Sequence, residues 1–449
     1  MPSRTSEALR VAVLADSDTR WKWGALTARR ITEHAEHVET AEHAANKPEL
    51  TGFLLRGRAT PTARQLAEVG VTADDLREVT GAEFLRALRD EGYDLVVLAL
   101  VGGAVQAMLH GIAALRLPRR PVLVTGYVGV VYEKLADGLL LRHGADVVLA
   151  NSRHDADRFR EVFHGVGADA SAVTEAALPF LGGAPYERHD GRDTVVFAAQ
   201  PSVPESRADR TYLLRRLVEH ARLHPHREVL LKLRSKPGEH TTHLEELPYQ
   251  KLADRLPGGL PPNFSLVYGH MGEVLDRTDL LVTVSSTAAL ESLHRRIPTA
   301  VLTDLGVREA LGNHHFLGSG LLTSWDALDG GHRPVADPEW VARQGVAADG
   351  AYDTAFDEAR GRVAELLARP GLPPLAPYYT PATAPGYLPA LLARHHLAAD
   401  GNPLPGAAPA TEPTGVRRLV RDAVRGAARG AYRHGVQRVA PVIRRMGAL

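Results

Sequence analysis

The chain has 449 residues, more than one hydrophobic core usually holds, so we expect two packed domains and a further tail. Its hydrophobic fraction of 44% and charged fraction of 24% are typical of a globular protein and exclude a mainly disordered chain. The lack of cysteine excludes disulfides, thiolate metal sites and cysteine nucleophiles. The first apolar run, 11–15, is too short for a signal peptide or a membrane span, so we expect a cytoplasmic protein.

Short apolar runs alternate with helical patterns over residues 1–180. The runs that we expect to form strands end in small or polar residues and cover 11–15, 52–55, 95–100, 121–125 and 146–150. Helical patterns, such as 82–91 and 152–163, lie between or after them. This alternation is typical of βα units and predicts a parallel sheet in an N-terminal Rossmann-like domain.

The same alternation returns after 178–192, a segment rich in Pro and Gly that we interpret as the interdomain linker. The second set of expected strands is 194–198, 229–233, 265–268, 280–284 and 299–302, with helices that include 212–223 and 288–295. Helical periodicity over 354–368 is expected to close this second Rossmann-like domain, 190–369. The Pro-rich segment 370–400 is expected to return to the first domain. The predicted fold class is α/β with two Rossmann-like domains.

The end of the chain differs in character from both domains. Residues 401–413 are mostly Pro, Ala and Gly, which indicates a flexible linker. Residues 414–449 contain nine Arg and one Asp, so this tail is strongly basic although the formal charge of the whole chain is zero. Its apolar and Arg residues take opposite sides of a helix, which predicts a helix lying on an anionic membrane surface. The alternative is a helix packed on the protein's own acidic surface or on a partner.

Three hydroxyl residues follow the expected strand 280–284. Ligands of doubly wound sheets bind at the carboxyl ends of strands, and Ser285, Ser286 and Thr287 lie at such an end, just before a helix. This arrangement predicts a phosphate-binding site, although the hydroxyls could instead only cap the helix. Glu291, one turn further, could accept hydrogen bonds from ribose hydroxyls or simply provide a favourable charge near the helix start.

A row of basic residues ends the expected strand 229–233. Because a strand has a two-residue period, Lys232, Arg234 and Lys236 share one face, which suits a diphosphate or a sugar acid; a solvated strand end is the alternative. His243, in the following loop, could reach the same ligand. Gln200, after the first strand of this domain, could meet a base or a phosphate oxygen.

The first domain offers acidic residues for acid–base chemistry. Asp16 and Asp18 follow strand 11–15, where a carboxylate could take the proton of an acceptor hydroxyl. Their spacing also matches a metal-binding DxD motif, and a structural turn is the third interpretation; we expect no metal. Gly129 follows strand 121–125 and permits close approach of a ligand, and Glu133 nearby is an alternative base.

Signatures of several other protein classes are missing from the sequence. It contains no GxGxxG, GxSxG, HExxH or Walker A motif, so a dehydrogenase, serine hydrolase, metalloprotease or phosphoryl-transfer enzyme lacks support. Aromatic residues make up 6% and the charge outside the tail is acidic, so we expect no nucleic-acid partner. No cofactor is expected.

Residues 232–239 and 280–293 resemble the second domain of GT-B glycosyltransferases such as bacterial capsule polymerases and polysialyltransferases. In those enzymes a basic or His-Pro motif and a Ser-Ser/Thr motif hold the nucleotide phosphate, which the resemblance implies for the three hydroxyl residues 285–287. At the His-Pro position this chain has Arg234, Ser235, Lys236 and Pro237.

A wider resemblance, over about residues 9–390, rests on segments 15–24, 197–204 and 231–243. On these segments the chain is similar to an actinobacterial family of glycosyltransferases. That family is associated with cell-wall glycopolymers, including teichulosonic acids built from sialic-acid-like nine-carbon sugars. The resemblance implies a GT-B fold and a CMP-linked donor.

These observations lead to one hypothesis with two rivals. We expect an inverting, metal-independent glycosyltransferase that moves a sugar from a nucleotide-sugar donor to a cell-wall, capsule or lipid-linked acceptor at the inner face of the membrane. A CMP-linked sialic-acid-like donor is favoured, and a UDP-sugar comes next. The rivals are a nucleotide-sugar 2-epimerase of the same architecture and a non-catalytic two-domain protein that binds a small molecule.

Overall fold

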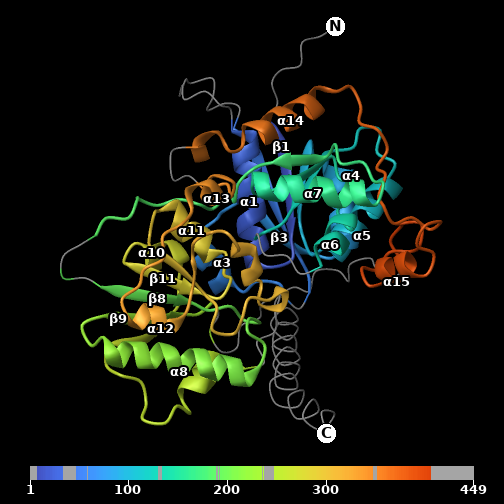
Figure 1. The fold of residues 1–449 in the computed structure, drawn as a ribbon. Helices are drawn as coiled ribbons and strands as arrows, with labels where there is room; N and C mark the ends of the chain where they lie inside the picture. Colours follow the sequence, from blue (N-terminus) through green and yellow to red (C-terminus); the bar gives the residue numbers. More distant parts are fainter. Residues whose placement is uncertain are drawn as a thin grey trace.

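Two parallel β-sheets organise the protein in the computed structural model, which describes residues 8–33, 47–57, 59–129, 134–188, 191, 193–234, 236, 247–346 and 351–405 (Figure 1). The first sheet has the strand order β3-β2-β1-β4-β5-β6-β7, and its neighbouring strands are parallel. Its strands are β1 (Arg10–Ala15), β2 (Glu49–Leu55), β3 (Asp75–Val79), β4 (Leu95–Ala99), β5 (Val122–Gly126), β6 (Val147–Ala150) and β7 (Val173–Glu175).

The second sheet has the order β10-β9-β8-β11-β12-β13 and is also parallel. Its strands are β8 (Thr194–Ala198), β9 (Glu228–Lys232), β10 (Phe264–Val267), β11 (Leu280–Thr283), β12 (Thr299–Leu302) and β13 (Leu322–Thr323). In both sheets the first strand lies inside the sheet and the order reverses beside it. The predicted α/β fold with two Rossmann-like sheets is therefore confirmed.

The central strands form because their side chains are apolar on both faces. Every residue of β4 (LVVLA) and of β12 (TAVL) is buried. Strands of parallel sheets are covered by helices on both sides, so continuous apolar runs suit them better than alternating ones. The edge strand β3 (DLREV) is different, because most of its residues are exposed. The continuous runs are the signal by which the sequence revealed the central strands.

The helices of the first sheet are α1 (Asp18–Thr32), α3 (Ala63–Val69), α4 (Gly81–Glu91), α5 (Gly102–Ala114), α6 (Leu135–Leu140) and α7 (Arg153–Gly165). Several begin at a capping residue: Ser17 caps α1, and Thr80 forms a capping box with Glu83 at α4. Helix α1 lies directly on the sheet at Gly24, where an added Cβ would come within 2.7 Å of the Ala99 Cβ. This close approach fixes the position of the second turn of α1 relative to the sheet.

The second sheet is accompanied by the helices α8 (Arg207–Leu223), α9 (Tyr249–Ala253), α10 (Met271–Leu275), α11 (Ala288–His294), α12 (Trp325–Asp329) and α13 (Pro338–Ala342). Short 3-10 turns occupy η1 (Glu309–Leu311), η2 (Asn313–Phe316) and η3 (Ala351–Thr354). Among them α8 is the long helix on the outside of this lobe, well separated from the first sheet (Figure 1).

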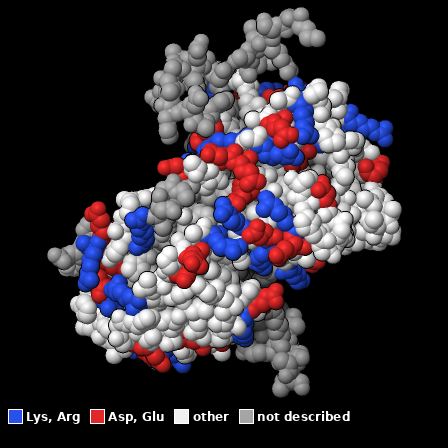
Figure 2. Space-filling model, turned by 45° about the horizontal axis from the view of Figure 1, so that its top comes forward, with Lys and Arg blue, Asp and Glu red and all other residues white. Residues whose placement is uncertain are grey.

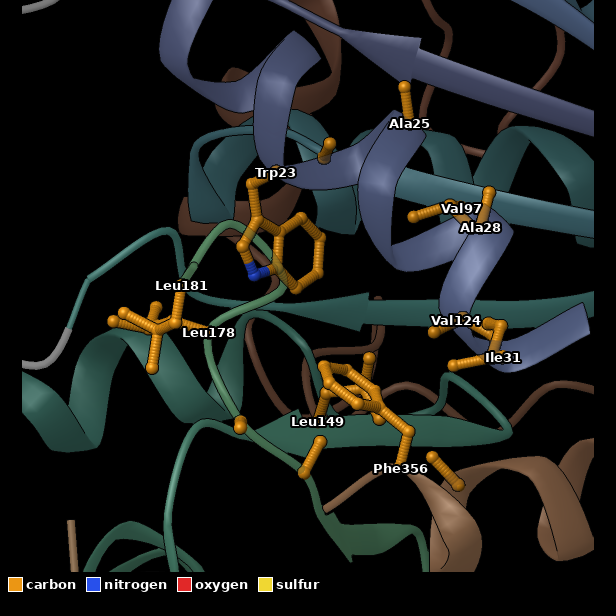
Figure 3. Packing of buried hydrophobic residues seen from close by; sticks show 14 of the residues in the cluster. Trp23, Ala25, Ala28, Ile31, Val97, Val124, Leu149, Leu178, Leu181 and Phe356 are labelled. Carbon is orange, nitrogen blue, oxygen red and sulfur yellow. The ribbon is translucent and has the colours of Figure 1, made fainter. Parts of the chain in front are cut away.

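Helix α14 (Asp357–Ala368) packs on the first sheet. The domain boundary predicted at residue 369 had assigned this helix to the second domain. The helix lies against α1 and strands β5, β6 and β7. Figure 3 shows Phe356, just before α14, close to Leu149, while Ile31 of α1 approaches Val124. The apolar face of α14 predicted a packed helix, but periodicity alone does not tell which sheet receives it.

The segment after α14 runs along the first domain. His110 Nε2 of α5 lies 3.0 Å from the Tyr379 carbonyl, and helix α15 (Tyr387–Ala393) buries Leu388 and Leu392 in the core beside α5. No helix of the described residues is both long and apolar enough to cross a membrane. The predicted basic tail, 414–449, and most of the linker 401–413 lie outside the described residues.

Candidate active site

The strand order reverses between β1 and β4 in the first sheet and between β8 and β11 in the second. In open parallel sheets, ligands bind beyond the carboxyl ends of the strands at such a point. Asp16 and Asp18 follow β1, whereas Gln200 follows β8 and the segment 285–287 follows β11. Six of the residues singled out from the sequence therefore stand at one of these two points.

Side chains of the two domains touch each other here. Arg234 Nη2, just beyond β9, donates to Asp18 Oδ1 at 3.0 Å and also to the Thr19 hydroxyl. Lys22 Nζ, in α1, lies 3.3 Å from His270 Nε2, just before α10. We call these five residues the junction. Figure 2 shows acidic and basic side chains gathered where the two lobes meet, so charged groups line this boundary.

The first of the three hydroxyl residues is used inside the protein. Ser285 is buried; its hydroxyl donates to the Leu311 carbonyl at 2.6 Å, and its amide donates to Gln200 Oε1 at 3.1 Å. The amide oxygen of Gln200 is thereby occupied as well. Ser285 and Gln200 hold the loops after β8, β11 and β12 together, so they support the site and do not offer these groups to a phosphate.

Ser286 and Thr287 keep groups that can reach a ligand. The Ser286 amide donates to Thr283 Oγ1 at 3.1 Å, and its hydroxyl oxygen accepts from the Ala288 amide at 3.2 Å. Ser286 therefore does cap the start of α11, but its hydroxyl hydrogen is left to donate. The Thr287 hydroxyl makes no hydrogen bond with the described part of the chain and is only half-buried.

Gly129 brings the loop after β5 against Thr287. Asn151 Nδ2 donates to the carbonyls of Tyr127 and Gly129 at 2.8 and 2.9 Å and so holds this loop in place. A Cβ at Gly129 would come within 2.9 Å of Thr287 Oγ1. The first domain therefore closes over the hydroxyl loop of the second at a position where no side chain fits without movement.

The basic row at the end of β9 divides into three different environments. Lys232 is buried, its Nζ donates to the Leu233 carbonyl at 2.8 Å, and burial lowers the pKa of its ammonium group. Arg234 contacts Asp18 as described. Lys236 is exposed, with Nζ 5.9 Å from the centre of the Tyr268 ring. Of the three, Arg234 is the cation that stands opposite a candidate base.

The two candidate bases of the first domain also differ. Asp16 pairs with Arg20 at 2.8 Å through Oδ1 and accepts from the Val101 amide at 3.0 Å through Oδ2, so it ties β1 to the start of α5. Asp18 faces the second domain and meets Arg234. Each carboxylate is directed at a cation, and their contacts do not converge on a shared metal position. Asp18 is therefore the better placed base.

Glu291 stands in α11, one turn after Thr287, and is partly buried. Burial raises the pKa of its carboxyl group, and the charges of Lys22, Arg295 and Lys232 oppose that rise. No hydrogen bond or ion pair joins this carboxylate to the described residues. A carboxylate without such a partner, surrounded by cations from both domains, remains available to a polar ligand.

Two predicted residues, Glu133 and His243, lie outside the described residues. Sequence reasoning missed Lys22 and His270, although both belong to the junction. Lys22 lies within the first turns of α1 after the acidic pair, which was a usable signal. His270 gave no such signal, because its approach to Lys22 joins positions 248 residues apart.

One cluster away from the junction has metal-binding residue types. His220, His224 and Asp329 place one ligand atom each within 4.8 Å of the others. However, His220 Nδ1 lies 2.6 Å from Asp329 Oδ1, Arg216 Nη2 donates to the same carboxylate at 2.8 Å, and Arg227 Nη1 lies 3.2 Å from His220 Nε2. These contacts occupy both ring nitrogens of His220 and the Asp329 carboxylate, although His224 Nε2 is buried without a hydrogen-bond partner among the described residues; we assign no metal to the cluster.

A cavity of about 240 Å³ lies at the opposite, amino edge of the first sheet. Its wall includes Arg10, Tyr93 and Arg120 together with the segment after α14. Arg120 pairs with Asp146 at 2.7 Å and donates to the Pro373 carbonyl, so it fixes the returning chain. Because parallel sheets bind ligands at the carboxyl edge, we do not assign the reaction to this cavity.

Two Rossmann-like parallel sheets that meet at their carboxyl edges give the protein the GT-B architecture, and its family model assigns it to the glycosyltransferases. The chain belongs to the family described as "Putative glycosyltransferase (DUF6716)", whose model matches residues 11–366. No curated protein matches the chain in sequence.

Solved structures of similar architecture include epimerases and glycosyltransferases. The S. aureus MnaA–UDP structure is 11% identical, with a TM-score of 0.49 over 81% of this chain and 99% of that one. UDP-GlcNAc 2-epimerase from Neisseria meningitidis bound to UDP-GlcNAc is 11% identical, with a TM-score of 0.49 over 78% and 99%. The glycosyltransferase SnogD from Streptomyces nogalater is 16% identical, with a TM-score of 0.38 over 80% and 96%. One architecture hosts many reactions, so substrate and mechanism are argued from the site.

Proposed function

We propose that the protein is an inverting, metal-independent glycosyltransferase whose second domain binds the phosphate of a nucleotide-sugar donor and whose Asp18 deprotonates the acceptor. The observation that carries this proposal is the 3.0 Å contact between Asp18 and Arg234. It joins a carboxylate at the switch point of one sheet to a cation at the carboxyl edge of the other. An acid–base group and a phosphate-neutralising group are needed together in such a transfer.

The second domain supplies the groups for the donor phosphate. Thr287 has a hydroxyl without a protein partner among the described residues, and Ser286 has a hydroxyl hydrogen left to donate. Arg234 adds a guanidinium, which matches phosphate oxygens in charge and geometry. Glu291, the carboxylate next along this face of α11, can accept from ribose hydroxyls. Ser285 and Gln200 position this loop.

The transfer is a single displacement at the anomeric carbon. The acceptor oxygen forms the new bond while the bond between the anomeric carbon and the phosphate oxygen breaks, and its electron pair leaves with the phosphate. Asp18 takes the proton of the acceptor hydroxyl. Arg234 neutralises the charge that develops on the phosphate, which removes the need for a metal ion at this step.

The donor that we favour is a CMP-linked sialic-acid-like sugar, with a UDP-sugar next. Support for CMP comes from the similarity of residues 280–293 to polysialyltransferases, and the cations Lys22, Lys232 and Arg234 suit a strongly anionic donor. We propose a cell-wall or capsule glycopolymer, or a lipid-linked precursor, as the acceptor. Association with the membrane depends on the tail 414–449, which lies outside the described residues, and stays a prediction.

A melting-temperature screen tests the donor site directly. CMP, UDP, GDP and ADP are added to the wild type, to Ser286→Ala and to Thr287→Val, because a ligand that binds the folded state raises its melting temperature. Ser171→Ala, a serine on an exposed loop, is the matched control. We expect one nucleotide to stabilise the wild type and the control but not the two site variants. No shift with any nucleotide at millimolar concentration would refute the donor site.

Products then separate transfer from its rivals. With the stabilising donor and an acceptor, a transferase releases nucleotide in proportion to new glycosidic bonds. An epimerase converts the donor alone into a second nucleotide sugar, and a binding protein shows no turnover. Conversion of the donor without an acceptor would therefore replace this proposal with the epimerase.

A further inference from the structure

Two nitrogen atoms from different domains face each other at the junction. Lys22 Nζ, on the first domain, lies 3.3 Å from Nε2 of His270, on the second. The Lys22 ammonium also lies 4.9 Å from the centre of the Phe180 ring, in the segment that connects the domains. Both residues are only partly buried, so a small ligand group can reach them.

The hydrogen-bonding roles of these atoms do not match each other. His270 Nδ1 accepts from the Gly272 amide at 3.2 Å, so this nitrogen carries no hydrogen. Neutral imidazole has one hydrogen, which must then be on Nε2, and a lysine ammonium has no lone pair to accept it. Two donors therefore face each other 3.3 Å apart, and an anionic oxygen beside the pair, within hydrogen-bond distance of both nitrogens, would satisfy both.

The surroundings favour an anion at this place. Burial and the charge of Lys22 lower the pKa of His270, so the ring is neutral at neutral pH and keeps the tautomer described above. Arg295 is close but occupied, because it donates to the Gly182 carbonyl and to Asp276 at 2.7 and 2.6 Å. The acidic groups that act on the pair are Glu273, at the start of α10, and Glu291.

We propose that Lys22 and His270 form a clamp that binds a second anionic group of the donor, in addition to the phosphate held by Ser286, Thr287 and Arg234. This inference rests on the proposed function. The clamp recognises an anionic oxygen, which comes from the second phosphate of a nucleoside diphosphate or from the carboxylate of a sugar acid linked to a nucleoside monophosphate. Because its halves belong to different domains, the bound anion also holds the domains together.

Variants that preserve the packing isolate the clamp. Lys22→Met removes the charge and keeps an apolar side chain beside Phe180. His270→Asn removes the imidazole and keeps a good capping residue for α10. Lys251→Met, on the exposed face of α9, is the matched control. Unchanged melting temperatures without ligand show that the variants fold.

Calorimetry compares the dissociation constants of UDP with UMP, of a CMP-linked sugar acid with CMP, and of inorganic pyrophosphate. We expect one pair to differ in the wild type by tenfold or more, and either clamp variant to abolish that difference, since a charge-assisted hydrogen bond contributes about tenfold to a hundredfold. Loss of the UDP/UMP difference identifies a second phosphate, and loss of the sugar-acid difference identifies a carboxylate.

The outcomes separate the clamp from the donor site. If nucleotides bind but both differences survive in Lys22→Met and His270→Asn, the clamp is refuted and the proposed function stands. If no nucleotide binds, the proposed function is refuted. The affinity for pyrophosphate then tests the clamp on its own. Pyrophosphate affinity that falls tenfold or more in both variants, but not in Lys251→Met, supports an anion clamp. Equal pyrophosphate affinity in all four proteins overturns it.

Discussion

Asp18→Asn replaces the carboxylate beside Arg234 with a neutral amide of nearly the same shape. If Asp18 takes the acceptor proton, its loss should lower kcat by about 10²–10⁴-fold, the usual contribution of a general base. The melting temperature should fall by a few degrees, because the pair is largely buried, at 15% side-chain exposure for Asp18 and 29% for Arg234, and a hydrogen bond between charged groups contributes about 1–3 kcal/mol. Donor affinity should stay equal or increase, because Arg234 no longer shares its charge with Asp18.

Asp16→Asn is the matched comparison two residues away. Asp16 and Arg20 are largely buried, at 15% and 14% side-chain exposure, and Asp16 also accepts from the Val101 amide. Loss of these charge-assisted contacts should cost about 1–3 kcal/mol of unfolding free energy and lower the melting temperature by a few degrees. Nucleotide release from the donor gives kcat, and thermal melting gives stability. If Asp16→Asn stopped turnover while Asp18→Asn remained active, the assignment of the base would be wrong.

Three further substitutions test other parts of the site. Gly129→Ala should weaken nucleotide binding at least severalfold in calorimetry, because the added Cβ would lie 2.9 Å from the Thr287 hydroxyl oxygen. The control Gly165→Ala, which adds its Cβ to open space, should bind nucleotide as the wild type does. Equal affinities of the two variants would contradict the close approach of Gly129 to Thr287. Ser285→Ala should lower the free energy of unfolding by about 1–3 kcal/mol in denaturant, since the buried Leu311 carbonyl loses its hydrogen-bond donor. An unchanged denaturation midpoint would show that the loop after β12 does not depend on this hydrogen bond. Glu291→Gln should weaken nucleotide binding and raise the melting temperature by about 1–3 °C at pH 8, because burial raises the pKa of the Glu291 carboxyl group and the folded wild type therefore loses stability as the pH rises through that pKa. The stability gain of the variant should vanish below the ordinary carboxyl pKa of 4.5. A gain that persists at pH 4 would show that burial of the charged carboxylate does not cause it.

Much of the fold was predictable because its central strands are buried on both faces. Runs such as LVVLA in β4 are typical of strands that helices cover on both faces, and the small or polar residues that follow several of them mark the carboxyl edge. The edge strand β3 escaped prediction because DLREV lacks an apolar run. Helix α14 was assigned to the wrong lobe because an apolar stripe identifies a buried face but not the surface that covers it.

The candidate site was predictable in its position and not in its contacts. The hydroxyl loop and the acidic pair follow strands, so the switch-point rule located them. The Ser285 hydroxyl donates to the Leu311 carbonyl, whereas the Thr287 hydroxyl has no partner within the described residues. This difference depends on how the loop after β12 folds back, which the sequence does not reveal. Lys22 and His270 are 248 residues apart in the chain, so a single sequence gives no sign that their side chains lie side by side.

The return of α14 to the first sheet has a consequence for motion. The chain crosses between the lobes twice, once at 178–192 and once between α12 and α14. Two connections between the lobes restrict their relative motion more than one would, and we expect the lobes to open and close by rotation about the line through both crossings. Such a movement returns the same side chains to the same partners at each closure. After a single proteolytic cut within 178–192, the second lobe would be held to the first sheet only by the non-covalent packing of α14, because the chain has no cysteine for a disulfide.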